Sequence, residues 1–407
     1  MFPHVPLSAR FAILASVALA SAASGGEIFA TVKHGDLVLK GGGGTIDAAI
    51  DQSGLSAGEF RITPNGGTTV NGAGTAQVVS GVTRDLRVVF ANNGSSLQAN
   101  SIGIPRDLRV KIGKDGSGTF NFTGITIGRD LRVANRGGFE LDLWQSEVGG
   151  RASWSGGAGF DDPDFRTLHV VGPIRVSLGA GQSVFRFLDL SQADQSLEVD
   201  AGGDDDQVIL GNSTIAKDLR IDAGGGTNEF MVNGIVAMRD VRFSGGGGPD
   251  TATLTSVGAG RDFRVALGGG QNSAIVTDCS LDRTLAYTGG NGVDMAHFEG
   301  VVGANDARIE LGGGANILSS TMNFTMHRLT VVAGAGLDTL ALQNVTCETD
   351  LKALIGSGDN QLTLTTVFVG GNLLVKAGSG NDAVAATTLT VMGTAKYKLD
   401  GGMNSHP

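Results

Sequence analysis

The chain has 407 residues, among them 66 glycines and 8 prolines, with 5% aromatic residues and a formal net charge of −10. Two compact globular domains would carry more large core side chains, so this composition favours a repetitive, turn-rich architecture. The excess of 40 acidic over 30 basic residues argues against a nucleic-acid partner, because nucleic-acid affinity comes mainly from Lys and Arg that neutralise phosphates.

Residues 1–22 are predicted to be a signal peptide. Arg10 precedes an apolar run at residues 11–19, and residues 18–22 contain two overlapping A-x-A patterns suited to cleavage. The run is too short for a stable membrane span, and no later run of about 20 apolar residues occurs. We therefore expect a secreted protein, extracellular or at the cell surface, with no membrane span after cleavage. An uncleaved N-terminal anchor is the alternative.

A short lead-in at residues 23–35 precedes a repeat domain that covers residues 36–407. The phrase RDLRV occurs at residues 84–88, 106–110 and 129–133, and related phrases recur further on. Counted from the Asp of this phrase, the copies follow at a spacing of 22 residues, less regularly within 36–84 and 135–200. The predicted copies begin at Asp36, Glu59, Asp85, Asp107, Asp130, Ala152, Pro173, Ser196, Asp218, Asp240, Asp262, Thr284, Asp306, Arg328, Asp350, Asn372 and Thr394.

Each copy contains three short strand patterns. In the copy that begins at Asp218, Leu219 and Ile221 alternate with polar residues, which is the period of a half-buried strand. Glycines at residues 224–226 then favour a turn. A second alternation follows at residues 229–233, and Ile235 and Ala237 form a third apolar pair before the next copy.

A unit of this kind cannot bury its apolar face alone, whereas stacked units bury a continuous core. The sequence therefore predicts an all-β fold, a right-handed parallel β-helix (β-solenoid) of about 17 coils with three short strands per coil. A β-propeller is the alternative, but its blades need about 40 residues each. The export signal and the 22-residue coils resemble bacterial secreted parallel β-helix proteins of the adhesin and exoprotein type, a class that also includes pectate-lyase-like enzymes.

The position ten residues after each anchor alternates between Asp and Asn. Carboxylates stacked about 4.8 Å apart would repel, and an intervening Asn both separates them and offers amide hydrogens. This pattern predicts a turn-stabilising ladder along the stack. Its members are Asp206, Asn228, Asp250, Asn272, Asp294, Asn316, Asp338, Asn360, Asp382 and Asn404.

Calcium binding is the alternative interpretation of this column. The turns that end at Asp250, Asp338 and Asp382 resemble the GGxGxD turns of calcium-binding RTX repeats, and hard oxygen ligands suit calcium. The spacing departs from that family, whose turns recur every nine residues. These three residues are the candidate metal ligands, and calcium is the one candidate cofactor; otherwise no cofactor is expected.

The Asp and Arg of the DLR phrase are expected to face outward two residues apart, so that stacking forms a stripe of each charge. Such a face would either bind an acidic polysaccharide or another chain, or simply keep the sheet solvated.

Aromatic residues are concentrated within 135–200, where the repeat is irregular. Exposed rings there would suggest stacking against sugars, and buried rings would suggest core packing. These residues are Trp144, Trp154, Phe160, Phe165 and His169.

The sequence favours a structural or adhesive surface or matrix protein without catalytic activity, since an even exterior does not provide the irregular pocket that catalysis needs. A carbohydrate-active enzyme or a polysaccharide-binding β-helix is the alternative, and an RTX-like calcium-binding exoprotein is a further one. The GDD at residues 203–205 resembles a polygalacturonase motif but lacks its companion motifs, and His297 and Glu299 form an isolated acid/base pair.

Two further expectations concern the cysteines and the last coil. Cys279 and Cys347 lie three coils apart in apolar columns, too far for a disulfide, and are predicted to be free, buried thiols. The final copy ends part-way through a coil, with Tyr397 on an edge strand and no capping helix. An exposed edge of this kind predicts end-to-end self-association or a covering partner.

Overall fold

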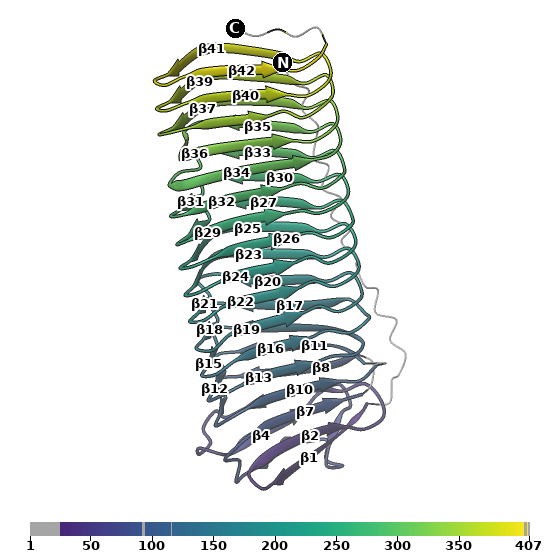
Figure 1. Cartoon of the computed structure of the whole chain (residues 1–407). Helices are drawn as coiled ribbons and strands as arrows, with labels where there is room; N and C mark the ends of the chain where they lie inside the picture. The colour runs from purple at the N-terminus through teal and green to yellow at the C-terminus, as the bar shows by residue number, and fades with distance from the viewer. Residues whose placement is uncertain (1–24, 92–93, 115, 403–404, 406–407) are drawn as a thin grey trace.

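The computed structural model describes residues 25–91, 94–114, 116–402 and 405, in which the chain forms a column of stacked coils (Figure 1). Within these ranges there is no helix, and 42 strands belong to one continuous sheet. The predicted all-β parallel β-solenoid with a 22-residue repeat is confirmed. The described residues contain no helix long and apolar enough to cross a membrane. The predicted signal peptide lies outside the described residues.

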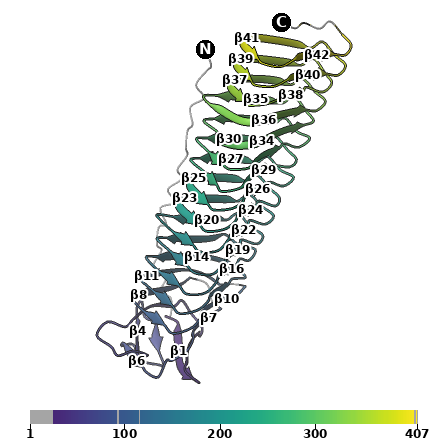
Figure 2. The ribbon, with the colours of Figure 1, turned by 60° about the vertical axis from the view of Figure 1, so that its left-hand side comes forward.

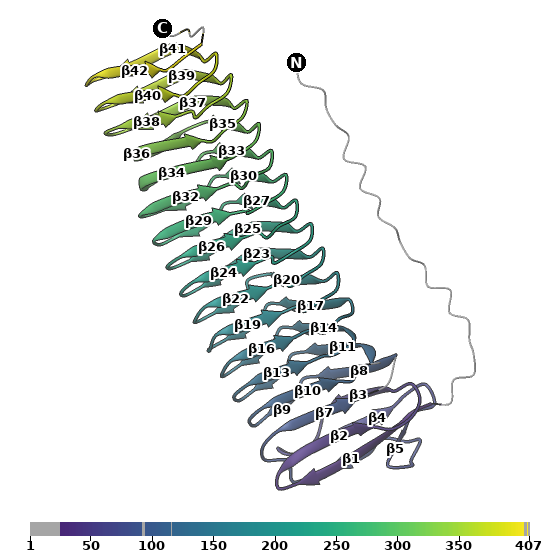
Figure 3. The ribbon, with the colours of Figure 1, turned by 45° about the vertical axis from the view of Figure 1, so that its right-hand side comes forward.

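The first column of strands follows the anchor residues and runs the length of the rod (Figures 2 and 3). Each strand pairs in parallel with its counterpart one coil away, as in Leu86, Leu108 and Leu131. The strands of this column are β2 (Asp36–Gly41), β7 (Leu86–Phe90), β10 (Leu108–Ile112), β13 (Leu131–Ala134), β16 (Ala152–Ser155), β19 (Ile174–Ser177), β22 (Leu197–Asp200), β24 (Leu219–Asp222), β26 (Val241–Ser244), β29 (Asp262–Ala266), β32 (Thr284–Thr288), β34 (Ala304–Gly312), β36 (Phe324–Ala333), β38 (Leu351–Leu354), β40 (Leu373–Ala377) and β42 (Ala395–Leu399).

The second column follows the glycine-rich turn of each coil. Several of its strands reach nine residues because they continue into the third column. They are β3 (Asp47–Asp51), β8 (Ser95–Asn100), β11 (Ser117–Thr123), β14 (Gly138–Trp144), β17 (Asp161–Arg166), β20 (Val184–Leu188), β23 (Gln207–Ile215), β25 (Glu229–Ala237), β27 (Thr251–Thr255), β30 (Ser273–Thr277), β33 (Met295–Glu299), β35 (Ile317–Thr321), β37 (Thr339–Cys347), β39 (Gln361–Val369) and β41 (Ala383–Val391).

The third column is formed by two-residue strands. They are β9 (Gly103–Ile104), β12 (Thr126–Ile127), β15 (Glu147–Val148), β18 (His169–Val170), β21 (Gln192–Ala193), β28 (Gly258–Ala259) and β31 (Ser280–Leu281). A corner residue with positive φ separates the second and third columns in most coils, a conformation that L side chains rarely adopt. Such corner residues include Ser101, Gly124, Gln145, Thr167, Asn212, Gly234, Ser256, Asp278, Gly300, Asn344, Thr366 and Thr388.

The core is a continuous apolar column because every second residue of each strand points inward and stacks on its counterpart in the next coil. Near the N-terminal end the core is aromatic: the ring centroid of Phe120 lies 5.6 Å from that of Phe90 and 4.8 Å from that of Phe139. Trp154 continues the stack at 5.5 Å from Phe139. Large rings thus fill the core from the regular coil of Phe90 into the irregular coil of Trp154.

The turn between the first and second columns brings backbone against backbone. An added Cβ at Gly246 would overlap the carbonyl oxygen of Gly224 in the preceding coil, and the nearest neighbours of many other turn glycines are likewise backbone atoms. Glycine at these positions is therefore needed for the coils to stack at the spacing of a parallel sheet.

The predicted repeat is corrected at the N-terminal end of the rod. The copy assigned at Glu59 is not a coil: β4 (Phe60–Pro64) pairs antiparallel with β3 and with β6 (Gln77–Val79), and β1 (Glu27–Lys33) pairs antiparallel with β2. With β5 (Thr69–Val70), these strands cover the N-terminal end of the rod. About 14 regular turns follow, rather than 17.

The copy assigned at Ala152 is shifted by one residue. Ala152 pairs with Leu131, so Arg151 stands in the column that Asp130 occupies one coil earlier. This shift reflects the change of spacing within the irregular stretch, where a 22-residue count no longer identifies the anchor.

Candidate functional site

The alternating Asp and Asn residues form a buried ladder that joins coil to coil. From Ser183 to Asp382, each side-chain oxygen accepts the backbone N–H of the residue one coil earlier, at 2.9 to 3.2 Å. Four of the Asn residues also donate Nδ2 to the Oδ1 of the next Asp, at 2.9 to 3.0 Å. The nine members between 206 and 382 are at most 4% exposed. The predicted ladder is confirmed for these residues; Asn404 lies outside the described residues.

The alternation has a chemical reason, since an ionised carboxylate only accepts hydrogen bonds whereas an amide also donates. The Nδ2 of Asn316 donates to the carbonyl oxygens of Gly312 and Gly314 in its own turn, at 3.4 and 3.2 Å. In an Asp coil the bond is reversed, and Gly246 donates its backbone N–H to the Oδ2 of Asp250 at 3.1 Å. Gly290 donates to the Oδ2 of Asp294 in the same way at 2.8 Å, so in these coils the bonding of the turn differs with the residue type.

The three residues predicted as calcium ligands all belong to this ladder. Asp250, Asp338 and Asp382 are 0 to 1% exposed, and the Oδ1 of each accepts an Asn amide from the preceding coil. They lie four and two coils apart, so the fold does not bring them together. No group of three or more His, Cys, Asp or Glu residues within the described ranges has a geometry that could hold a metal ion.

Chelation tests the calcium hypothesis directly. A metal bound to the native state stabilises it by mass action, so removing a structural metal lowers the melting temperature. Because each ladder carboxylate already has amide donors, we expect EDTA to leave the melting temperature unchanged. A drop of several degrees, restored by added calcium, would instead support metal sites at these residues.

Asp206 is the first Asp of the alternating ladder and has the weakest set of donors. The preceding coil offers Ser183, whose backbone N–H donates at 2.9 Å, in place of an Asn amide. The Oδ2 of Asp206 is buried and has no hydrogen-bond partner. Burial, reinforced by the nearby carboxylates Asp204 and Asp205, raises the pKa of Asp206 to about 7.

This raised pKa predicts a pH-dependent stability. A carboxyl whose folded pKa lies above its unfolded value stabilises the fold below the unfolded pKa, and that contribution is lost as pH rises through the folded pKa. We expect the melting temperature to fall between pH 5 and pH 8. Asp206→Asn should remove part of this dependence and raise the free energy of unfolding at pH 8 by up to about 4 kcal/mol. Thermal melts of both proteins across this range provide the measurement, and an unchanged slope in the variant would contradict the assignment.

Most Asp residues of the DLR-type phrases are buried, contrary to the prediction that they face outward, whereas the side chain of Asp218 is 35% exposed. Asp107 is 0% exposed and accepts bonds from Arg109 in its own coil and from Arg129 in the next. Hydrogen bonds from these two arginines hold the pKa of Asp107 far below its ordinary value. Asp107 also accepts the backbone N–H of Asp130 at 3.4 Å. A second ladder thus runs along the anchor column, with exposed arginines on both sides.

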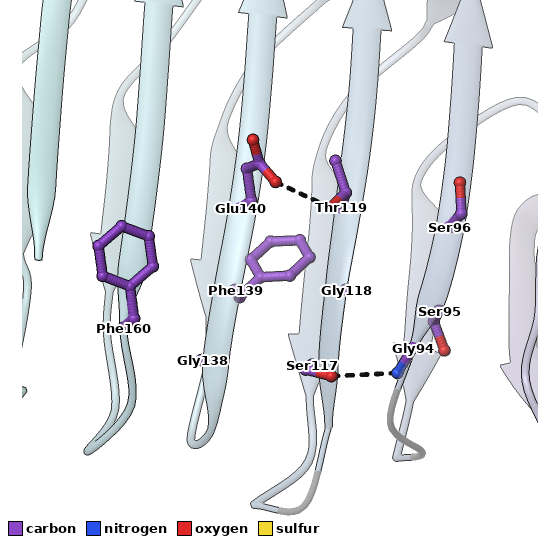
Figure 4. A pocket seen from close by; sticks show the side chains of 10 residues that line it. All are labelled: Gly94, Ser95, Ser96, Ser117, Gly118, Thr119, Gly138, Phe139, Glu140 and Phe160. Carbon is purple, nitrogen blue, oxygen red and sulfur yellow. Dashed lines mark hydrogen bonds between the residues drawn. The ribbon is translucent and has the colours of Figure 1, made fainter. Parts of the chain in front are cut away.

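The irregular stretch contains a candidate site, a pocket of about 440 Å³ on the second column (Figure 4). Its base is formed by small residues, including Gly118 and Gly138, and the ring of Phe160, 55% exposed, stands at one side. Thr119 donates its hydroxyl to the Oε2 of Glu140 at 2.8 Å within the pocket. The site therefore combines an exposed aromatic ring with hydroxyl and carboxylate groups.

Four carboxylates continue from this pocket along the outer face of β14 and β17. Glu140 lies opposite Asp162 in the register, and Asp142 lies opposite Asp164. Burial raises the pKa of Asp142 to about 6, with Glu140 and Asp164 adding to the effect, and burial likewise raises the pKa of Asp162 to about 6. Carboxyls with raised pKa values in a cluster are candidates for acid/base chemistry.

Arginines and a second aromatic ring border this cluster. Arg186 forms an ion pair with Asp162, and Arg166 forms one with Asp164 at 2.9 Å. The guanidinium of Arg166 also lies 5.4 Å from the centroid of Trp144, which is 43% exposed. We call the surface made by Glu140, Asp142, Trp144, Phe160 and Asp162 the acidic-aromatic patch.

The predicted aromatic concentration divides between core and surface. Trp154 and Phe165 are 3% and 2% exposed and pack in the core, as the packing interpretation predicts, whereas Trp144 and Phe160 are exposed. The carboxylates of the patch were missed by sequence reasoning, although the three acidic residues within 161–164, in an irregular coil, were a usable signal. His169 lies at the third column and hydrogen-bonds to Asp194 at 3.0 Å.

The remaining sequence candidates do not form comparable sites. His297 and Glu299 share an outward face, with Nε2 and Oε2 3.8 Å apart, and the Nδ1 of His297 lies 2.8 Å from the hydroxyl of Ser319. Asp205, in the GDD, accepts the backbone N–H of Thr227 at 2.7 Å as part of a turn.

The two cysteines are buried, as predicted, and both thiols are free. Burial raises the pKa of Cys279 to about 11 and that of Cys347 to about 12. Neither thiol is therefore poised to react as a thiolate at neutral pH.

Comparison with known proteins gives no further identification. No protein-family model, curated protein or solved structure matches the chain.

Proposed function

We propose that the protein is a secreted structural or adhesive rod of the cell surface or extracellular matrix, without catalytic activity, that binds polysaccharide at the acidic-aromatic patch. The exposure of Phe160 above a base of small residues carries this proposal, because an apolar ring left open beside hydroxyl and carboxylate groups suits stacking against a sugar ring. A binding surface at this patch also explains why the repeat is least regular in this part of the rod.

A stiff spacer role is supported by the two buried ladders. Both connect successive coils through side-chain to backbone bonds, and their acceptors are largely buried. Buried hydrogen bonds from one coil to the next favour one register over its alternatives. A rod of this kind holds a binding patch at a fixed distance from either end, which suits an adhesive or matrix component.

Removal of the Phe160 ring tests the proposal. Binding of the full chain to a panel of immobilised neutral and acidic polysaccharides is measured for the parent protein and for Phe160→Ala. We expect about tenfold weaker binding of the recognised polysaccharide, equivalent to roughly 1.4 kcal/mol. Leu190→Ala is the matched control, because Leu190 is 80% exposed and lies outside the patch. Equal binding by all three proteins, or binding to no polysaccharide, would overturn the proposal.

A carbohydrate-active enzyme is the second candidate, favoured by the raised pKa values of Asp142 and Asp162. Their positions are diagonal in the register. The strand spacing and the rise per residue place their Cα atoms about 8 Å from each other. Inverting glycosidases place their two carboxyl groups roughly 6.5 to 9.5 Å apart. Release of reducing ends from the bound polysaccharide, abolished in Asp142→Asn, would favour this function over pure adhesion.

Export and self-association belong to the same proposal. Expression of the full chain in a bacterial host, followed by mass analysis of the mature protein, tests cleavage near residue 20 or 22. End-to-end association through the strand that contains Tyr397 stays a prediction, which light scattering over a concentration series can measure.

A further inference from the structure

An arginine occupies the anchor column at two positions, Arg151 and Arg328. Arg151 occupies the position of Asp130 and Asp107, since its backbone carbonyl accepts the N–H of Leu131 as theirs accept the N–H of the corresponding leucines. Its own backbone N–H donates to the Oδ1 of Asp130 at 3.1 Å, as in a regular coil. The ladder therefore continues into Arg151, but the carboxylate that the column normally supplies next is missing.

The coil after Arg151 needs no acceptor at this position. Its residue in the column is Pro173, which has no backbone N–H to donate. The side chain of Arg151 is thus not required for the ladder and is 59% exposed. Its one ion-pair partner among the described residues is Asp130, at 3.5 Å, and Asp130 is already paired with Arg132 at 2.7 Å.

A hollow lies beside Arg151 because a second column also changes there. This column is a row of arginines, one per coil, each two residues after its anchor position. Ser153 stands in register between Arg132 and Arg175, where a third arginine would continue the row. The missing side chain leaves a space of about 300 Å³ lined by these residues and by Ala152 and Pro173. Three guanidinium groups therefore surround one hollow.

The charge around the hollow is not balanced. Arg132 and Arg151 share the buried carboxylate of Asp130, and Arg175 pairs with the half-exposed Glu198 at 3.3 Å. Asp107 likewise receives two arginines, so the pairing at Asp130 is that of a regular coil, and the third guanidinium, that of Arg175, brings the extra positive charge to the hollow. Arginine stays charged at any ordinary pH and binds planar oxyanions through two parallel bonds.

We propose that the hollow between Arg132, Arg151 and Arg175 binds a carboxylate or sulfate group of an acidic polysaccharide. The bound group takes the place that the Asp of a regular coil holds in the anchor column. The row continues through Arg109 and Arg87 at one residue per coil, so further acidic groups of the same polymer meet a cation about every 4.8 Å along the rod. This site lies on the first column and is independent of the acidic-aromatic patch on the second.

Arg151→Ser tests the site, because Ser196 occupies the same column in a later coil and shows that serine fits there. Arg264→Ser is the matched control: Arg264 lies in the same row as Arg175 but four coils further along the rod, is 50% exposed, and pairs with Asp262, which keeps Arg283 as a partner. Titration calorimetry of the full chain uses polygalacturonate and a sulfated polysaccharide as separate probes, with inorganic sulfate as competitor. Melting curves confirm that both variants fold.

The expected result is at least tenfold weaker binding of one or both polymers by Arg151→Ser and less than a twofold change in Arg264→Ser. The polymer whose binding is weakened shows whether the site prefers carboxylate or sulfate. Competition by inorganic sulfate at millimolar concentration places the contact at a single oxyanion site. Equal losses in both variants, or equal binding of duplex DNA, would reveal a general charge effect and overturn the proposal. Because Phe160→Ala leaves these arginines in place, failure of one proposal is distinguishable from failure of the other.

Discussion

Replacing Asn316 by Asp is expected to lower the free energy of unfolding by about 3–5 kcal/mol at pH 8. Asp294, Asn316 and Asp338 are each 0% exposed, so the variant stacks three carboxylates about 4.8 Å apart without solvent. It also removes the amide that donates to Asp338 at 2.9 Å and to the turn carbonyls of Gly312 and Gly314. Like charges in a buried column disfavour each other's ionisation, so the loss should shrink as pH falls toward 5.

Denaturant unfolding at pH 8 and at pH 5 measures both parts of this expectation. Asp338→Asn is the matched control, since it makes the opposite exchange at the next position and removes a carboxylate whose pKa burial already raises. We expect the control to be within about 1 kcal/mol of the parent at pH 8, or more stable. An Asn316→Asp protein as stable as the parent at pH 8 would mean that the ladder does not depend on its alternation.

The ladder was predictable because stacking in register turns a sequence period into a column. Once the repeat is known to be 22 residues, residues 22 apart must lie side by side, and the alternation of Asp and Asn along that column can be examined without a structure. The same logic identified the apolar columns and the buried cysteines. Positions inside strands were thus the most predictable part of the molecule.

The anchor Asp was misassigned because it precedes its strand. Alternation of inward and outward side chains holds only within a strand, and Asp107 lies at the corner before β10, where the side chain turns along the stack and is covered by two arginines. Buried carboxylates of this kind require paired donors from two coils, which a single repeat unit does not reveal.

The acidic-aromatic patch and the Arg151 hollow escaped prediction for a different reason. Both lie where the spacing changes by one residue, so that counting by 22 displaced the anchor from Arg151 to Ala152. The strand that follows Glu59 was assigned to a coil although it pairs antiparallel, because strand direction is set by contacts with β3 and β6 that the repeat does not encode. Irregular segments are also where functional surfaces differ from the regular scaffold.

Deleting single coils tests the ladder on the intact scaffold. Removal of residues 262–283 joins Arg261 to Thr284 in register and places Asp250 directly against Asp294 in the buried column. Removal of residues 240–261 joins Arg239 to Asp262 and places Asn228 against Asn272 instead. The two deletions have the same length and each removes one anchor Asp, so they differ mainly in whether two buried carboxylates become neighbours.

The pH dependence of the melting temperature of these two deletion proteins is the most direct test of the claim that the Asp/Asn alternation holds the coils together. At pH 8 we expect the protein that lacks residues 262–283 to melt at least several degrees below the one that lacks 240–261. The reason is that one of its two adjacent buried carboxyls must remain protonated, which costs about 1.4 kcal/mol per unit of pKa shift. Near pH 5 the difference should largely disappear. Equal melting temperatures at pH 8 would contradict the account.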